Sequence, residues 1–454
     1  MSEDKSKFGQ RASRYTKTTG TLAGLAAKLA GEKFLGMNIN KDEHAKQLMA
    51  ALGNLKGPLM KVAQIVATIP EAVPPEYARE LQQLQADAPP MGWPFVKRRM
   101  KTELGAEWQE KFGSFEQEAA AAASLGQVHK AQSLEGELLA CKLQYPDMQS
   151  AIDADLKQLR LIFSVYEKYD PSIATKNIQE EVAERLFEEL DYDLEARHTK
   201  LYAHLLRDEK DVHVAQVKDD LSTGRLLTTT WLEGKKILSY KDADQETRNQ
   251  LALNLFRAWY VPLYKSGIIH GDPHLGNYTV REDLSINLLD FGCVRVFPAS
   301  FVGGVIDLYR ALQKDDNDLA VHAYETWGFT GLSKDVVEIL NVWARFLYGP
   351  ILDDSVRAIG QAEKGAMYGK ETARKVHMAL KEARAGIPVP REFVFMDRAA
   401  LGLGSVFIHL NAQVNWHNLF NELIADFDKQ KLAKDQVALL KKFDLEKDVE
   451  KTAA

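Results

Sequence analysis

The chain has few cysteines, little net charge and no long apolar run. Its two cysteines, Cys141 and Cys293, cannot form a disulfide framework and are typical of a reducing compartment. The net charge of -6 is small for 454 residues, which argues against an electrostatic nucleic-acid binder. The N-terminus lacks the apolar stretch of a signal peptide, and no apolar run reaches the roughly 18 residues of a membrane span. We therefore expect a cytoplasmic protein that binds no nucleic acid.

The most informative motif runs from His270 to Asn277 and is followed by Asp290-Phe291-Gly292. Asp272, Asn277 and Asp290 have the spacing of a kinase catalytic loop and its metal-binding strand. Asp272 is the candidate that orients or deprotonates a nucleophile. Asn277 and Asp290 are candidate ligands for Mg²⁺, which prefers oxygen ligands. We expect Leu288-Leu289 to form a short buried strand that fixes the Asp290 carboxylate.

A candidate phosphate-binding segment lies upstream of this motif. Lys142 interrupts an apolar strand-like run, where an unpaired ammonium would be costly, so we expect it to reach phosphates and a helix glutamate. The preceding small-residue stretch aligns with a glycine-rich loop, with alanines at its first two glycine positions. Alanine restricts φ, so the phosphate contacts should differ from those of a standard kinase. The nucleotide-binding candidates here are Ala121, Ala122, Ala123, Ser124, Gly126 and Val128.

Two further parts of a nucleotide site have candidates. The apolar strand that ends before Gly234 is the expected hinge against the adenine, with Thr230, Trp231 and Leu232 as its contact residues. The helix glutamate that pairs with Lys142 must come from the acidic segment 180–195. Periodicity does not choose among the acids of that segment.

The order of these segments predicts an α+β fold, namely a bilobal protein-kinase-like fold with an N-terminal helical extension. The expected parts are an N-terminal segment 1–44, a helical extension 45–113, an N-lobe 114–234, a helical C-lobe 235–430 and a charged tail 431–454. Leucines at helical spacing in segment 1–44 allow two interpretations. One is a helix packed on the domain, and the other is a basic amphipathic helix that contacts an anionic membrane surface.

Taken together, these segments resemble the UbiB (AarF-like) family of atypical kinases over about residues 50–410. The family's K-x-G-Q helix is similar to the segment that holds Lys61 and Gln64, the extension pair. Its alanine-rich loop, A-A-A-S-[IL]-G-Q-V-H, is similar to Ala121–His129. Its E-x-D and E-A motifs are similar to Glu189–Asp191 and Glu195–Ala196. The chain departs from the family at Ala63 for glycine, Leu275 for proline and Thr230 for glutamate.

The resemblance implies that Glu195 is the helix glutamate that pairs with Lys142. It also implies that Glu189 and Asp191 face the extension pair, and that the extension covers the place where a protein kinase binds its peptide. The implied cofactors are ATP or ADP with Mg²⁺. The implied role is ATP hydrolysis or phosphorylation of a small or lipid substrate in ubiquinone or other isoprenoid-lipid biosynthesis. The expected partners are an isoprenoid lipid or quinone precursor and lipid-biosynthesis enzymes, with peripheral contact at the inner membrane.

Two other functions stay open at this point. Small-molecule phosphotransferases of the aminoglycoside or choline kinase type also use an H-G-D-x-x-x-x-N loop, although the extension pair and the alanine-rich loop argue against that class. A pseudokinase that binds nucleotide and regulates a partner complex would keep the same residues without turnover.

Overall fold

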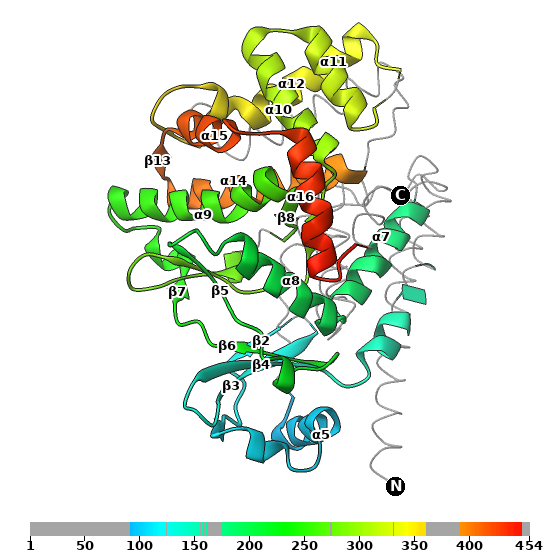
Figure 1. The fold of residues 1–454 in the computed structure, drawn as a ribbon, viewed down its shortest axis with the longest axis vertical. Helices are drawn as coiled ribbons and strands as arrows, with labels where there is room; N and C mark the ends of the chain where they lie inside the picture. The colour runs from blue at the N-terminus through cyan, green and yellow to red at the C-terminus, as the bar shows by residue number, and fades with distance from the viewer. Residues whose placement is uncertain are drawn as a thin grey trace, which may run out of the picture. The chain divides into compact units, whose positions relative to one another are not determined.

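The computed structural model describes residues 91–446, except for residues 124, 155, 158–159, 161–174, 273–274, 330 and 360–390. The chain folds into two compact units (Figure 1). The first unit runs to Asp193 and also includes Lys218–Trp231. The second unit comprises Leu194–Val217 and the residues from Leu232 onward. The predicted segment 1–44 and the extension pair lie outside the described residues.

The first unit is built on an antiparallel sheet in the order β1-β3-β4-β6, with β2 paired to β3. Its strands are β1 (Ser114–Phe115), β2 (Ala121–Ala122), β3 (Gly126–Gln132), β4 (Leu138–Gln144) and β6 (Leu226–Thr230). Its helical elements are α5 (Trp93–Leu104), η1 (Trp108–Lys111), α7 (Thr175–Glu188) and η2 (Asp219–Leu221), and α8 (Tyr192–Leu205) begins here and continues into the second unit.

Alternation along β4 separates a core face of this sheet from a half-buried face. Leu139, Cys141 and Leu143 are fully buried, whereas Ala140 and Lys142 between them are half-buried. The buried face packs against α5 and η1, which share its hydrophobic core. The strand-like run predicted around Lys142 is therefore confirmed as β4, and Lys142 projects from the face opposite the core.

The second unit combines short strands with many helices. Its strands are β5 (Val212–Val214), β7 (Lys235–Lys236), β8 (Ile268–His270), β9 (Tyr278–Val280), β10 (Ile286–Leu288), β11 (Val294–Val296), β12 (Arg357–Ala358) and β13 (Gln413–Val414). Its helical elements are η3 (Ile237–Tyr240), α9 (Gln245–Ser266), η4 (Leu275–Asn277), α10 (Ala299–Lys314), α11 (Asn317–Thr326), α12 (Lys334–Leu352), α14 (Arg391–Leu410), α15 (Trp416–Ile424) and α16 (Lys429–Lys442). The strands form one sheet in the order β5-β10-β9-β7 and two pairs, β8 with β11 and β12 with β13.

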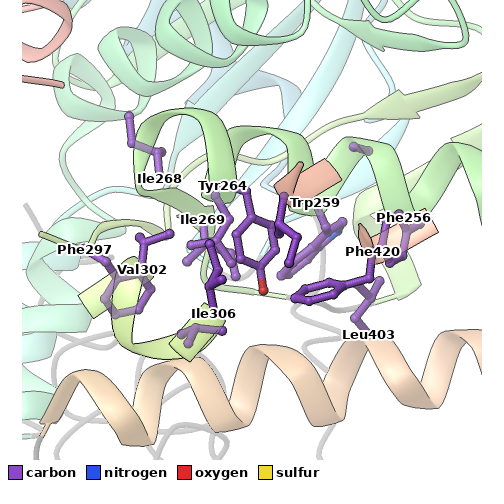
Figure 2. Packing of buried hydrophobic residues seen from close by; sticks show 14 of the residues in the cluster. Phe256, Trp259, Tyr264, Ile268, Ile269, Phe297, Val302, Ile306, Leu403 and Phe420 are labelled. Atoms are coloured by element: carbon purple, nitrogen blue, oxygen red, sulfur yellow. The ribbon is translucent and has the colours of Figure 1, made fainter. Parts of the chain in front are cut away.

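Helix α9 lies at the centre of this unit and leads directly into β8. Its N-cap, Asp244, accepts a hydrogen bond from the Thr247 amide at 2.8 Å, and it ends at Gly267 in the left-handed conformation. Large side chains from α9, β8 and α10 pack together around this junction (Figure 2). The strand that leads to the catalytic motif is therefore anchored in the core. Among the described residues, no helix is long and apolar enough to cross a membrane.

The α+β expectation is confirmed, while some strand limits differ from the predicted ones. The residues Val212–Val217 have the apolar character of a strand, but the strand in this stretch, β5, ends at Val214. The strand expected at Leu288-Leu289 is β10, which ends at Leu288, and the Leu289 side chain is 41% exposed. The prediction of a short buried strand was therefore correct for Leu288 and wrong for Leu289, because apolar character alone does not show where a short strand ends.

Candidate functional site

In the second unit, the catalytic segment leaves the core at the end of β8. Asp272 follows two residues after this strand, and Asn277 closes the short helix η4. The Asn277 side-chain amide donates to the Asp272 carboxylate and to the Asp272 backbone carbonyl, both at 3.1 Å. The structure therefore brings these two predicted residues together. Pro273 and His274 lie outside the described residues.

Asp290 reaches the same region through the β9–β10 hairpin. Leu288 pairs with Tyr278, and the Leu289 amide donates to the Asn277 carbonyl at 3.1 Å, so Asn277 and Asp290 flank one end of this hairpin. One oxygen of the Asp290 carboxylate accepts the Gly292 amide at 2.9 Å. This contact orients the carboxylate within the Asp-Phe-Gly turn.

A buried histidine connects the catalytic loop to the Asp-Phe-Gly segment. His270 is 1% exposed, and its Nε2 donates to the Asp290 carbonyl while its Nδ1 accepts from the Asp272 amide at 3.2 Å. These roles require the neutral tautomer with the proton on Nε2. Burial lowers the pKa of His270, which favours the neutral ring. His270 thus fixes Asp272 and Asp290 through their backbones.

Helix α8 presents one face to the same turn. Glu195 is 4% exposed, and a Cβ built on Gly292 would lie 4.0 Å from its carboxylate. His198 Nδ1 contacts the Phe291 carbonyl at 3.1 Å, and the Tyr202 ring packs on the Phe291 ring. Sequence reasoning missed His198 and Tyr202. Their spacing of three and seven residues from Glu195, on one helical face, was the signal that could have found them.

The oxygen atoms at this end of the hairpin are suited to Mg²⁺. The Asn277 Nδ2 donates both of its hydrogen bonds to Asp272, so Oδ1 of Asn277 is the candidate metal-ligand atom. Asp290 adds a carboxylate that one backbone amide already orients. Carbonyl and carboxylate oxygens are the hard ligands that Mg²⁺ takes.

In the first unit, the alanine-rich stretch forms a tight hairpin. Ala121 pairs with Val128 and Ala122 with Gln127, and the Ala123 amide donates to the Gly126 carbonyl at 2.9 Å. The predicted phosphate loop is therefore a β2–β3 hairpin, the place a glycine-rich loop has in a kinase. Ser124 lies outside the described residues.

The half-buried face of this sheet carries two further predicted nucleotide residues, Val128 and Lys142. Val128 and Leu227 pair with Lys142 from its two sides, so all three side chains point to one face. The Lys142 ammonium lies 5.2 Å from the centre of the Tyr192 ring, a cation–π contact. Tyr192 is 2% exposed, and sequence reasoning had not singled it out.

Gly126 is required for close packing at the base of the hairpin. A Cβ at this position would lie 2.3 Å from the Leu143 carbonyl oxygen and 2.8 Å from the Tyr192 hydroxyl. No side chain fits there unless β3 moves away from β4. Gly126 therefore sets the spacing between the hairpin and the strand that carries Lys142.

Two buried polar residues behind the hairpin were also missed. The Gln127 side chain exchanges hydrogen bonds with both the amide and the carbonyl of Met91, and its amide nitrogen contacts His129 Nε2 at 2.7 Å. His129 Nδ1 lies 2.8 Å from the Glu116 carbonyl, and burial lowers the His129 pKa. This network ties the hairpin to the chain that enters α5. Its signal was the Q-x-H spacing, which puts both polar side chains on one strand face.

The predicted hinge follows β6. Thr230 is the last residue of that strand, and the Trp231 amide donates to the Leu138 carbonyl at 2.8 Å. The Trp231 ring lies 4.8 Å from the Lys130 ammonium. Leu232 begins the next part of the second unit. Contact of these residues with an adenine stays a prediction.

The predicted contacts of the remaining site residues stay predictions. Glu189 and Asp191 lie in the short turn that joins α7 to α8. Their predicted partners, Lys61 and Gln64, lie outside the described residues. Lys142 and Glu195 belong to different units. Their predicted ion pair therefore stays a prediction.

The chain is similar to several curated atypical kinases. It is 26% identical over 423 residues to the mitochondrial atypical kinase coq-8 of Caenorhabditis elegans, an alignment that covers 92% of this chain and 55% of that protein. It is 27% identical to the mitochondrial atypical kinase COQ8 of Saccharomyces cerevisiae, with coverage of 85% and 77%. The chain thus spans little more than half the length of the worm relative.

A solved structure and a domain family agree with this similarity. A Mycobacterium tuberculosis protein, solved in complex with erythromycin, matches with a TM-score of 0.59 and 27% identity over 87% of this chain and 97% of its own. Residues 83–323, more than half of the chain, match the ABC1 atypical kinase-like domain. With the kinase-like spacing of Asp272, Asn277 and Asp290 in place, we conclude that the chain belongs to the ABC1 (UbiB/COQ8) family of atypical kinases.

Proposed function

We propose that the protein is an ATP-binding, Mg²⁺-dependent atypical kinase or ATPase that supports ubiquinone or other isoprenoid-lipid biosynthesis. The observation that carries the proposal is the cluster at the end of the β9–β10 hairpin, where Asp272 and Asn277 are hydrogen-bonded and His270 links Asp272 to Asp290. Phosphoryl transfer requires a carboxylate that orients the attacking group, placed beside oxygen ligands that hold the metal ion.

In this proposal each residue has one task. Lys142 binds the α- and β-phosphates, and the β2–β3 hairpin covers them. Asn277 and Asp290 hold Mg²⁺, which when bound neutralises phosphate charge. Asp272 orients the attacking hydroxyl or water and accepts its proton as the new bond to the γ-phosphorus forms and ADP leaves.

The lipid part of the proposal rests on the relatives. The worm and yeast proteins are named mitochondrial atypical kinases of the COQ8 type, and the family resemblance implies a role in quinone biosynthesis. We therefore propose a lipid or quinone precursor as the molecule that stimulates or receives phosphoryl transfer. Peripheral attachment to a membrane belongs to the same proposal.

The test is an ATPase assay on the purified full chain with Mg²⁺, with and without anionic vesicles and quinone-precursor-like phenols. We expect slow phosphate release that vesicles or phenols increase. ATP binding with Mg²⁺ but no phosphate release under any condition would favour the pseudokinase. Rapid phosphorylation of a soluble amine or alcohol would favour the small-molecule phosphotransferase.

A further inference from the structure

Helix α16 has a buried glutamine on its packed face. The buried positions of this lysine-rich helix are Leu432, Gln436 and Leu440, which recur every four residues and form one stripe. Gln436 is 5% exposed, and its two neighbours in the stripe are leucines. A buried amide is costly unless it is hydrogen-bonded, so a glutamine in a leucine stripe calls for specific partners.

The partners of Gln436 are two backbone carbonyls of the catalytic segment. Its Nε2 donates to the Ser266 carbonyl at 2.8 Å and to the Phe297 carbonyl at 2.9 Å. Ser266 is the last residue of α9, whose final carbonyls have no partner within the helix. Phe297 directly follows β11. One side-chain amide therefore holds together the chain entering β8 and the chain leaving β11.

The fit around Gly267 shows how close this contact is. Gly267 has φ +69°, and a Cβ there would lie 2.3 Å from the Gln436 Nε2 and 2.5 Å from the Phe297 carbonyl oxygen. The Gly267 carbonyl accepts the Phe297 amide at 2.7 Å. A glycine is therefore needed for the amide to reach both carbonyls.

The same two strands lead from this contact to the reacting groups. In the β8–β11 pair, Val296 lies opposite Ile268 and Val294 opposite His270, and the Gly271 amide then donates to the Cys293 carbonyl at 2.6 Å. The next residue along one strand is Asp272. Across the pair, the Asp-Phe-Gly turn comes just before Cys293. The end of the pair at Ile268 and Phe297 packs in the hydrophobic core (Figure 2). Because Gln436 binds the carbonyls of Ser266 and Phe297, it contacts the end of the ladder opposite the reacting groups.

We propose that Gln436 is a positioning residue, through which α16 fixes the β8–β11 pair and thereby the relative placement of Asp272 and Asp290. A displacement of about 1 Å at the reacting groups can lower the rate about 100-fold. Loosening the end of the β8–β11 pair that Gln436 holds is therefore enough to reduce turnover. The inference rests on the proposed phosphoryl-transfer function for its kinetic consequence. Its structural content, the fastening of the pair by one amide, is independent of that function.

The test replaces Gln436 by methionine, which has a similar shape and lacks the donor. Gln430→Met makes the same change at an exposed position of the same helix and serves as the control. We expect Gln436→Met to lower kcat for ATP hydrolysis about 10-fold, with KM for ATP within about twofold of wild type, at a temperature where the protein is fully folded. Hydrogen exchange should accelerate in peptides covering 267–272 and 290–297, and Gln430→Met should change neither measurement.

The outcomes separate this inference from the proposed function. Wild-type kcat and wild-type exchange in Gln436→Met would overturn the inference, and so would a loss of thermal stability with kcat unchanged. If Gln436→Met cannot be purified, Gln436→Leu, which also lacks the donor, adds no charge and matches the two leucines of the stripe, is expected to give the same two results. If the wild-type protein hydrolyses no ATP, the proposed function fails, and the exchange measurement alone decides whether Gln436 fastens the strand pair.

Discussion

Replacing His270 should weaken the fold and the catalytic segment together, because one buried ring serves both Asp272 and Asp290. Its Nε2 donates to the Asp290 carbonyl, and its Nδ1 accepts the Asp272 amide. A buried hydrogen-bonding group left without a partner costs about 1–3 kcal/mol. The two groups orphaned in His270→Leu therefore predict a loss of roughly 2–6 kcal/mol in the free energy of unfolding, measured by chemical denaturation.

Two smaller substitutions separate the contacts of His270. Asparagine places an acceptor near the Nδ1 position and keeps the Asp272 contact, whereas glutamine places a donor near the Nε2 position and keeps the Asp290 contact. The free energy of unfolding should fall by about 1–3 kcal/mol in each of these two variants. The expected order, from most to least stable, is wild type, then His270→Asn and His270→Gln, then His270→Leu. Equal losses in all three variants would refute the reasoning, and so would a leucine variant as stable as wild type.

The stabilising effect of His270 should also depend on pH. Burial lowers its pKa in the folded protein below the ordinary 6.5, so the unfolded state binds the proton more tightly. The contribution of His270 is therefore complete above about pH 6.5 and is lost as pH falls through that value toward the lowered pKa. The difference in unfolding free energy between wild type and His270→Asn, which does not titrate at this position, should shrink from about pH 7.5 to about pH 5. A constant difference would contradict this.

Three predictions concern the first unit. Gly126→Ala should lower the free energy of unfolding by about 1–3 kcal/mol and weaken ATP binding, because the new Cβ would lie 2.3 Å from the Leu143 carbonyl oxygen of β4. The control Gly404→Ala, whose Cβ would enter open space, should be neutral or stabilising when both variants are compared in thermal melts. Tyr192→Leu should weaken ATP binding a few-fold in calorimetry by removing the ring beside Lys142, and Tyr192→Phe should not. Burial raises the pKa of Cys141 to about 12, so iodoacetamide at pH 8 should alkylate this thiol only after denaturation, as read by peptide mass spectrometry.

The sequence was most informative where function rests on short spacings. Asp272, Asn277 and Asp290 lie within 19 residues, and a single loop and hairpin bring them to one end of the sheet. The apolar run around Lys142 likewise predicted the strand β4. In both cases the geometry follows from local chain periodicity, which the sequence displays directly.

Long-range contacts could not be predicted in the same way. Gln436 donates to a carbonyl 139 residues earlier, and Gln127 binds the backbone of Met91, 36 residues before it. Helical spacing indicates that position 436 lies in a buried stripe, but it does not show which carbonyls the amide meets. Such partners depend on how helices pack in the folded unit, and one sequence does not specify that packing.

The most direct test of the central claim is the Mg²⁺ dependence of ATP hydrolysis in Asp290→Asn. Asp208→Asn, at a side chain that is 83% exposed, is the matched control. We predict that Asp290→Asn lowers the rate by about 100-fold or more at saturating ATP and Mg²⁺, because a charged metal ligand is lost, while Asp208→Asn leaves it unchanged. A wild-type rate and a wild-type Mg²⁺ titration in Asp290→Asn would contradict the assignment of this cluster to phosphoryl transfer.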